Sequence, residues 1–225
     1  MLRTLSGEIT PTSGTVRIKG KTPRDYGPRA LALHRAVLSQ QVTVAFPFPV
    51  AEVVRMGAGD RRGATIDSLV ESTLAEVDLD DMHDRIIGTL SGGEQQRAHL
   101  ARVLVQLQCG ENEHGPGILM LDEPTASLDL CHQIDLLAIV GRRHARGTTV
   151  VTIIHDLNLA ALFAKRIIML DRGTIAADGP PADTITDPLL ERVFGLSGAV
   201  NRIPAPPLPF VLPQSAAKTS RAGLP

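Results

Sequence analysis

A short stretch with two glycines, residues 89–97, holds residue types that bind anions. Ser91 and Glu94 have the S-x-x-E spacing of a capping box, which predicts that a helix begins here. Gly92 and Gly93 leave their backbone N–H groups accessible, because glycine has no side chain to cover them. Unpaired N–H groups and the helix dipole both favour negative charge at such an end. Taken alone, the pattern fits a phosphate site and an ordinary capped helix equally well.

Two later segments each end in polar side chains of a kind that active sites use. The apolar run 118–121 is followed by Asp122 and Glu123, and the apolar run 150–154 is followed by His155. Both runs read as buried parallel strands, and open α/β sheets bind ligands at the carboxyl ends of such strands. Each feature alone has an ordinary structural explanation. Their order along one chain indicates a common site.

These motifs in this order resemble those of the ATP-binding cassette (ABC) ATPases, and the resemblance extends over residues 2–195. The matching motifs are the ABC signature at 90–94, the Walker B end at Asp122 and Glu123, the D-loop at 127–129 and the switch histidine at His155. The resemblance implies an α/β, P-loop NTPase-like ABC ATPase domain with an antiparallel β lobe and a small helical lobe.

The resemblance also implies a role for each residue. In this family two domains meet head to tail, and ATP and Mg²⁺ lie between the P-loop of one and the signature of the other. Glu123 then polarises the attacking water, His155 contacts the γ-phosphate, and Asp129 reaches across the dimer. The expected catalytic residues are Glu123, His155 and Gln40, the expected nucleotide-binding residues are Ser91, Gly92, Gly93 and Asp129, and the expected metal ligands are Asp122 and Gln40. Gln40 is included because it ends the predicted strand 36–40, in the Q-loop position.

The start of the chain departs from the family pattern. Residues 1–8 resemble the helix that directly follows the P-loop, and the motif G-x-x-x-x-G-K-[ST] occurs nowhere in the 225 residues. We therefore expect a truncated start that lacks the first strand and the P-loop. The alternative is a genuine short form that cannot hold nucleotide by itself.

Length and composition limit the possibilities further. A chain of 225 residues is long enough for one domain with a large core. The formal net charge of −1 gives no electrostatic argument for nucleic acid, and we expect no nucleic-acid partner. No apolar run approaches the roughly 20 residues of a membrane span. Cys109 and Cys131 have no metal or redox spacing and suit a reducing cytosol.

The periodicity of the chain places the supporting elements. We expect an ABC ATPase domain at 1–195, with a helical lobe at about 41–89, and a mobile tail rich in Pro and Ala at 196–225. Helices are predicted at 29–35, 50–56, 66–77, 130–146, 157–165 and 186–194. Strands are predicted at 15–20, 36–40, 118–122, 150–154, 166–170 and 174–177. The polar, glycine-rich stretch 108–117 is expected to be a surface loop.

The helical lobe indicates what kind of ABC protein this is. It shows no sustained heptads of the kind that repair and chromosome ATPases insert there, which favours a transporter subunit. Residues 35–40, 46–57 and 155–195 resemble the ATPase subunits of bacterial haem importers, within the iron-siderophore and cobalamin importer group. The loop 46–50 gathers Phe46 and Phe48, and such clusters mark interaction surfaces about as often as ordinary packing.

The resemblance therefore implies an ATP-hydrolysing subunit that powers the import of haemin, or a related iron chelate. Its expected partners are a second copy of the subunit, an integral membrane permease and, indirectly, a periplasmic binding protein. Its expected place is the cytoplasmic face of the inner membrane, as a peripheral protein. Two alternatives stay open, namely a catalytically silent ABC-like partner domain and a soluble ABC ATPase outside transport.

Overall fold

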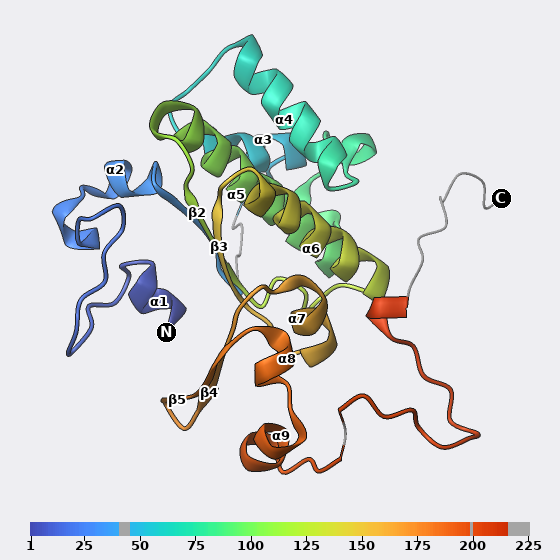
Figure 1. The fold of residues 1–225 in the computed structure, drawn as a ribbon. Coiled ribbons are helices and arrows are strands. Elements are labelled where there is room, and N and C mark those ends of the chain that lie inside the picture. Colours follow the sequence, from blue (N-terminus) through green and yellow to red (C-terminus); the bar gives the residue numbers. More distant parts are fainter. Residues whose placement is uncertain (41–45, 199, 216–225) are drawn as a thin grey trace. The chain divides into compact units, whose positions relative to one another are not determined.

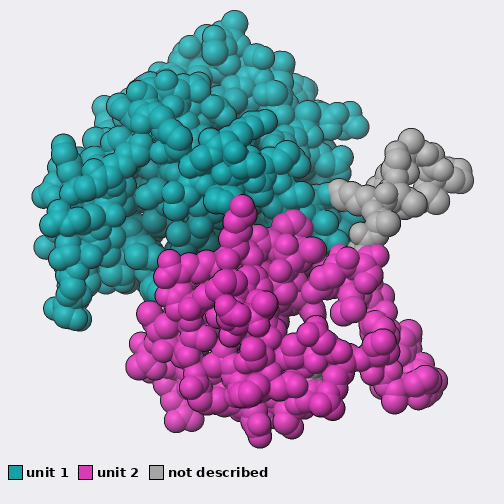
Figure 2. All heavy atoms as spheres, in the orientation of Figure 1, with its two compact units in different colours: residues 1–153 teal, residues 154–225 magenta. Residues whose placement is uncertain are grey.

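The computed structural model describes residues 1–40, 46–198 and 200–215 (Figure 1). The chain forms two compact units, residues 1–153 and residues 154–225, coloured separately in Figure 2. The expected domain limits at 195 and at 41–89 stay predictions, and residues 41–45 of the expected helical lobe lie outside the described residues. The expected upstream strand and P-loop also stay predictions.

The first unit is built on a parallel sheet of three strands, in the order β1-β2-β3. These are β1 (Arg35–Leu38), β2 (Ile118–Asp122) and β3 (Thr149–Ile153). Their apolar runs fit burial on both faces of a parallel sheet, and Leu38 pairs in register with Leu121, both without exposed surface. The α/β prediction is confirmed. The carboxyl ends of these strands meet at one edge of the sheet.

Helices of the first unit gather around α5 (Gly92–His114), which packs against β1 and against three helical segments. These are α3 (Val50–Arg55), the 3₁₀ turn η2 (Met56–Ala58) and α4 (Ala64–Glu76). The η2 turn approaches α5 closely at Gly57, where a Cβ atom would lie 2.1 Å from the carbonyl oxygen of Arg102. The predicted helices at 50–56 and 66–77 are confirmed.

A further long helix, α6 (Leu130–Ala145), packs on β3 and buries one apolar face. Leu136 and Val140, one helical turn apart, are both buried. Gly147 follows the helix with a φ of +101°, a conformation that glycine adopts without strain. The helix predicted at 130–146 is therefore confirmed. Short 3₁₀ turns at η3 (Asp80–Met82) and η4 (Ile87–Thr89) lead into α5.

The surface loop predicted at 108–117 is wrong, because α5 continues through most of it. Cys109 is buried, and Gly110 lies so close to Leu33 that a Cβ atom would come within 2.2 Å of the Leu33 carbonyl oxygen. The glycine therefore permits a helix to pass close to another segment, a role that composition cannot distinguish from that of a loop glycine. Only residues 115–117 form the connection to β2.

The strand predicted at 15–20 is also wrong. Ile18 and Lys21 form an isolated bridge around a tight turn, in which Lys19 and Gly20 have φ values of +46° and +84°. Within the described residues, no strand pairs with this segment, and an alternating pattern needs a neighbour to become a strand. The helix predicted at 29–35 shortens to α2 (Pro28–Ala32), because Arg35 already begins β1.

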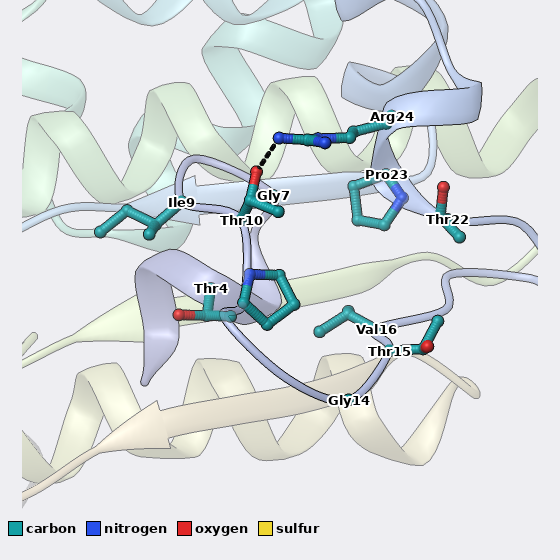
Figure 3. Close-up of a pocket in the computed structure, with 11 residues that line it drawn as sticks. Thr4, Gly7, Ile9, Thr10, Gly14, Thr15, Val16, Thr22, Pro23 and Arg24 are labelled. Atoms are coloured by element: carbon teal, nitrogen blue, oxygen red, sulfur yellow. Dashed lines mark hydrogen bonds between the residues drawn. The ribbon is translucent and has the colours of Figure 1, made fainter.

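The remaining N-terminal segment contains α1 (Leu2–Leu5) and the 3₁₀ turn η1 (Pro23–Asp25). Its turns enclose a pocket of about 180 Å³, whose lining includes Thr4, Gly7, Thr10, Val16, Pro23 and Arg24 (Figure 3). The Arg24 guanidinium donates a hydrogen bond to the Thr10 hydroxyl at the rim. None of the lining residues is one of the expected site residues, so this pocket is separate from the predicted chemistry.

The second unit is centred on an antiparallel pair, β4 (Ile167–Asp171) and β5 (Thr174–Gly179), which confirms the strands predicted at 166–170 and 174–177. Met169 of β4 shares a small core with Leu189 and Leu190. Four short helical segments complete the unit, namely α7 (Leu157–Phe163), α8 (Pro181–Thr184), α9 (Asp187–Phe194) and the 3₁₀ turn η5 (Pro213–Ser215). No helix within the described part of either unit is both long and apolar enough to cross a membrane.

Candidate functional site

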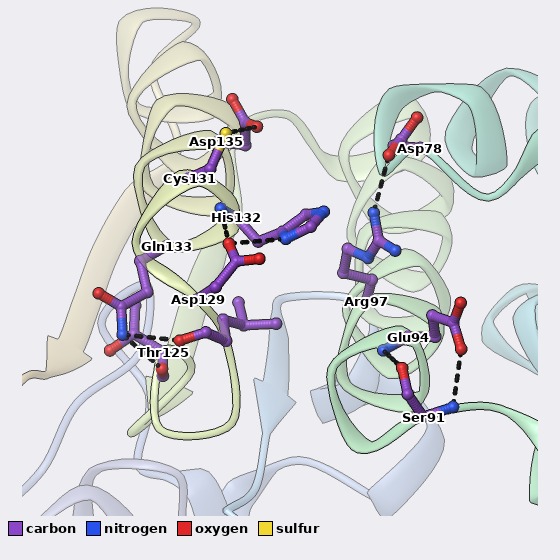
Figure 4. A network of polar contacts seen from close by, with 11 residues as sticks. Asp78, Ser91, Glu94, Arg97, Thr125, Asp129, Cys131, His132, Gln133 and Asp135 are labelled. Carbon is purple, nitrogen blue, oxygen red and sulfur yellow. Dashed lines mark hydrogen bonds and ion pairs between the residues drawn. The ribbon is translucent and has the colours of Figure 1, made fainter. Parts of the chain in front are cut away.

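The N-terminus of α5 has the predicted capping box (Figure 4). The Glu94 backbone N–H donates to Ser91 Oγ at 3.3 Å, and the Ser91 N–H donates to Glu94 Oε2 at 2.7 Å. Hydrogen bonds to the Glu94 carboxylate, first from the Ser91 backbone N–H and then from the Ser91 side chain, hold the pKa of Glu94 below its usual 4.5. Ser91 and Gly92 are exposed, and Gly93 is half-buried. The helix end therefore offers backbone groups to solvent, which is the arrangement that an anion requires.

Two glutamines after the capping box, neither of them among the expected site residues, attach the helix end to its surroundings. Gln95 Nε2 donates to the Leu90 carbonyl at 2.9 Å. Gln96 Nε2 donates to the Pro124 carbonyl at 3.4 Å, which connects α5 to the loop that follows β2. In the sequence, only their place directly after the expected signature sets these glutamines apart. The identity of a glutamine does not show which group its side chain will contact.

The structure brings two expected catalytic residues together at the carboxyl edge of the sheet. Gln40 follows β1 and Glu123 follows β2, and Gln40 Nε2 donates to Glu123 Oε2 at 2.8 Å. Asp122 is the last residue of β2 and is half-buried. Glu123 has a φ of +49°, the left-handed conformation that costs a residue with a Cβ atom about 1 kcal/mol. Two carboxylates and an amide thus stand where parallel strands end.

Asp129 caps the next helix. Its Oδ1 accepts the His132 backbone N–H at 2.9 Å and lies 2.8 Å from His132 Nδ1 (Figure 4). Gln133 Nε2 donates to the carbonyls of Thr125 at 3.1 Å and Leu128 at 3.0 Å. Gln133 is not among the expected site residues. The loop between β2 and α6 is therefore fixed by side chains of α6 itself.

The starts of α5 and α6 lie side by side. A Cβ atom placed on Gly93 would lie 3.3 Å from the Ser127 carbonyl oxygen and 3.3 Å from Leu128. This is tight enough to leave little room for a larger residue at the position. Four of the eight expected site residues, Ser91, Gly92, Gly93 and Asp129, thus lie at two neighbouring helix starts, and Glu123 begins the loop that leads from β2 to α6.

His155 belongs to the second unit and is exposed there. It immediately precedes Asp156, whose carboxylate caps α7 by accepting the N–H groups of Asn158 at 2.7 Å and Leu159 at 3.0 Å. The expected contact of His155 with a nucleotide stays a prediction.

No group of three or more His, Cys, Asp and Glu side chains suited to a metal ion occurs among residues 1–40, 46–198 and 200–215. Asp122 and Gln40 do supply carboxylate and amide oxygens, which are the donors that Mg²⁺ prefers. Mg²⁺ commonly binds through one or two carboxylates plus substrate phosphates, so this donor set fits an ion that arrives with a nucleotide.

Comparison with known proteins agrees with this geometry. The family described as "ABC transporter" matches residues 1–126. The Hemin import ATP-binding protein HmuV of Rhodopseudomonas palustris (strain BisA53) is 56% identical over 214 residues, which cover 95% of this chain and 79% of that protein. HmuV of Nitrobacter winogradskyi (strain ATCC 25391 / DSM 10237 / CIP 104748 / NCIMB 11846 / Nb-255) is 59% identical over 194 residues, covering 86% and 72% of the two chains.

Among solved structures, cbiO1 from Clostridium perfringens, part of the ABC transporter complex cbiONQ, superimposes with a TM-score of 0.66 at 24% identity. The match covers 84% of this chain and 75% of that one, and at this identity it supports the fold alone. The family match extends through the signature, the Walker B end and the first residues of the following loop. The chain belongs to the ABC transporter family of ATP-binding proteins.

Proposed function

We propose that this chain is the ATP-hydrolysing subunit of an importer that carries haemin across a membrane. The family accounts for ATP binding, and the haemin substrate is supported by the HmuV proteins, which share more than half of their aligned residues with this chain. The single observation of the structure that carries the catalytic part is the hydrogen bond between Gln40 and Glu123.

Glu123 is the proposed general base that orients and polarises the attacking water. Its position after β2 is set by the sheet, and the Gln40 amide holds one carboxylate oxygen. Phosphoryl transfer depends mainly on positioning and charge neutralisation, so a carboxylate fixed by a neighbouring strand end suits the role. His155 is the proposed second contact to the γ-phosphate.

The proposed nucleotide contacts of the first unit come from the two adjacent helix starts. Ser91, Gly92 and Gly93 are the proposed contacts of the γ-phosphate of a nucleotide that the opposite subunit holds, with Gly92 and Gly93 offering their backbone N–H groups. Asp129 reaches across the same interface. Asp122 and Gln40 are the proposed ligands of Mg²⁺, which supplies charge neutralisation at the phosphates when it is bound.

The proposed assembly contains a second copy of this subunit and an integral membrane permease, with a periplasmic binding protein acting on the far side of the permease. The subunit itself binds peripherally at the cytoplasmic face of the inner membrane. This subunit contacts the permease and not the haemin, so substrate choice lies outside its own residues.

The test is Glu123→Gln in the complete complex with its permease, where we expect ATP turnover to fall by at least about 100-fold while ATP binding is retained. Glu71→Gln, an exposed glutamate of α4, is the control and should hydrolyse ATP like the native complex. Native-like turnover of Glu123→Gln would remove Glu123 from the role of base and favour a catalytically silent ABC-like subunit.

A further inference from the structure

A buried arginine near the end of α6 joins three helices. Arg143 is 6% exposed, and its guanidinium donates to Glu76 Oε2 at 2.5 Å and to Gln108 Oε1 at 2.9 Å. Glu76 is the last residue of α4, and Gln108 lies in the part of α5 that the sequence predicted as a loop. We call Arg143, Glu76 and Gln108 the three-helix junction.

The junction is energetically demanding. A buried charge is costly to desolvate, and Arg143 Nε has no hydrogen-bond partner among the described residues. A buried ion pair of this kind adds little net stability, yet removal of one partner is strongly destabilising. Arg142 provides a natural comparison, because it contacts the same Glu76 at 3.3 Å with a side chain that is 52% exposed. Exposed ion pairs such as this one contribute little to the free energy of unfolding.

The junction lies on the same helices that carry the proposed nucleotide contacts. At their N-terminal ends, α5 and α6 meet where Gly93 approaches Ser127. Further along, Gln108 of α5 meets Arg143 of α6, so the two helices run in the same direction. The segment directly after α4 contacts α5 itself, where Arg97 Nη1 donates to Asp78 Oδ2 at 3.0 Å.

The C-terminal part of α5 is also attached to the sheet. Glu111 Oε1 accepts the Gly117 N–H at 2.9 Å and the Thr148 hydroxyl at 2.7 Å. Gly117 precedes β2 and Thr148 precedes β3, so one carboxylate connects α5 to both strand starts. With α5 fixed to the sheet, the junction ties the C-terminal ends of α4 and α6 to the distal part of this fixed body.

We propose that the three-helix junction is a positioning device. It sets the spacing between the start of α5, with Ser91 to Gly93, and the start of α6, with Asp129, by fixing the distal parts of the same helices. Arg143 is a positioning residue in this scheme and contacts no nucleotide. The significance of the spacing rests on the proposed function, whereas the spacing itself is a property of the chain without nucleotide.

Hydrogen exchange of the full chain without nucleotide tests the proposal. In Arg143→Met, we expect exchange at 90–97 and 127–133, both remote from the substitution, to rise by about tenfold while exchange in β2 stays unchanged. The matched control is Arg142→Met, which removes the exposed contact to the same Glu76 and should exchange like the native chain. A residue that served only general stability would raise exchange in β2 as well.

Two milder variants keep the test informative if Arg143→Met fails to fold. Arg143→Lys retains the charge but loses the planar fork that reaches two partners, and Gln108→Leu removes one of those partners. Each should raise exchange at 90–97 and 127–133 by a smaller factor. Increases confined to 104–114 and 140–148 would overturn the proposal. Because no ATP is present, this result is independent of the Glu123→Gln test.

Discussion

Glu123 combines an unusual backbone with a fixed side chain. Its φ of +49° is a conformation that glycine adopts freely and that a Cβ atom disfavours. Its carbonyl oxygen accepts the Ala126 N–H at 3.3 Å, and its carboxylate accepts the Gln40 amide. The turn after β2 therefore uses a residue that is conformationally unfavourable there, and the carboxylate is the part of that residue which glycine could not supply.

This conformation gives a prediction about stability at one residue. Both Glu123→Ala and Glu123→Gly remove the carboxylate, but only alanine retains the Cβ atom. We expect the glycine variant to have the larger free energy of unfolding, by about 1 kcal/mol, in a denaturant titration.

The control is the same pair of substitutions at Glu71, which is exposed within α4. In a helix, alanine should exceed glycine by about 1 kcal/mol, so the order of the two variants reverses between the sites. An alanine variant at Glu123 as stable as the glycine variant would contradict the left-handed conformation.

At this scale the sequence predicted which residues gather, but not what holds them. The resemblance to ABC ATPases named both Gln40 and Glu123 as site residues, and the structure joins their side chains where two parallel strands end. The hydrogen bonds of Gln96 and Gln133 could not be predicted, since both donate to backbone carbonyls of a loop whose path depends on the tertiary fold.

At the scale of elements, α5 shows where sequence signals are sufficient. Its start was predicted correctly, because the capping box between Ser91 and Glu94 is a local interaction. Its end was predicted wrongly, because Gly110 and the polar residues around it resemble a loop when packing is unknown. Packing against Leu33 and the contacts of Gln108 and Glu111 favour the helix instead.

The interior of α5 also contains a histidine that responds to pH. His99 is 4% exposed, and burial, followed by the charge of Arg102, lowers its pKa from 6.5 to about 4. The unfolded chain binds a proton at this site near 6.5, whereas the folded chain does not until about 4. Stability that is complete above 6.5 is therefore lost as the pH falls from 6.5 towards 4.

We expect His99→Leu to remove this loss. Between about pH 7 and pH 5, the free energy of unfolding of the native chain should fall by up to about 2 kcal/mol more than that of the variant. Chemical denaturation at the two pH values measures the difference. His83→Leu, at an exposed histidine, is the control and should follow the native chain. Parallel curves for native and His99→Leu would show that His99 does not titrate this way.

At the scale of the molecule, strands with buried partners were predictable and the segment without one was not. The apolar runs at 118–122 and 150–154 read as parallel strands and are β2 and β3. The alternating pattern of residues 15–20 predicts a strand by the same kind of rule, yet these residues form only a turn with an isolated bridge. An alternating apolar pattern is a property of one segment, whereas a strand forms only when a second segment pairs with it.

Phe46 and Phe48 form an exposed aromatic pair on the first unit. Phe46 is 69% exposed and Phe48 37% exposed, and their rings contact edge to face at 6.1 Å between centroids. The backbone beneath them is fixed, since the Ile87 N–H donates to the Phe48 carbonyl at 3.0 Å and Pro49 bridges to Ile86. An exposed aromatic pair whose backbone is held at Phe48 and Pro49 suits a docking surface, because aromatic anchors dominate the energy of protein interfaces.

We expect this pair to dock on the cytoplasmic face of the permease. Replacing both Phe46 and Phe48 by Ser should lower the amount of subunit that co-purifies with the permease by about tenfold, because two anchors are lost from the interface. Circular dichroism and thermal unfolding of the variant should match the native chain, since exposed side chains contribute little to folding. The matched control is Phe194→Ser, at a phenylalanine of α9 that is 52% exposed, and its co-purification should be unchanged. If the double variant co-purifies like the native chain, the permease binds elsewhere on the subunit, and the aromatic pair serves only the packing of its own loop.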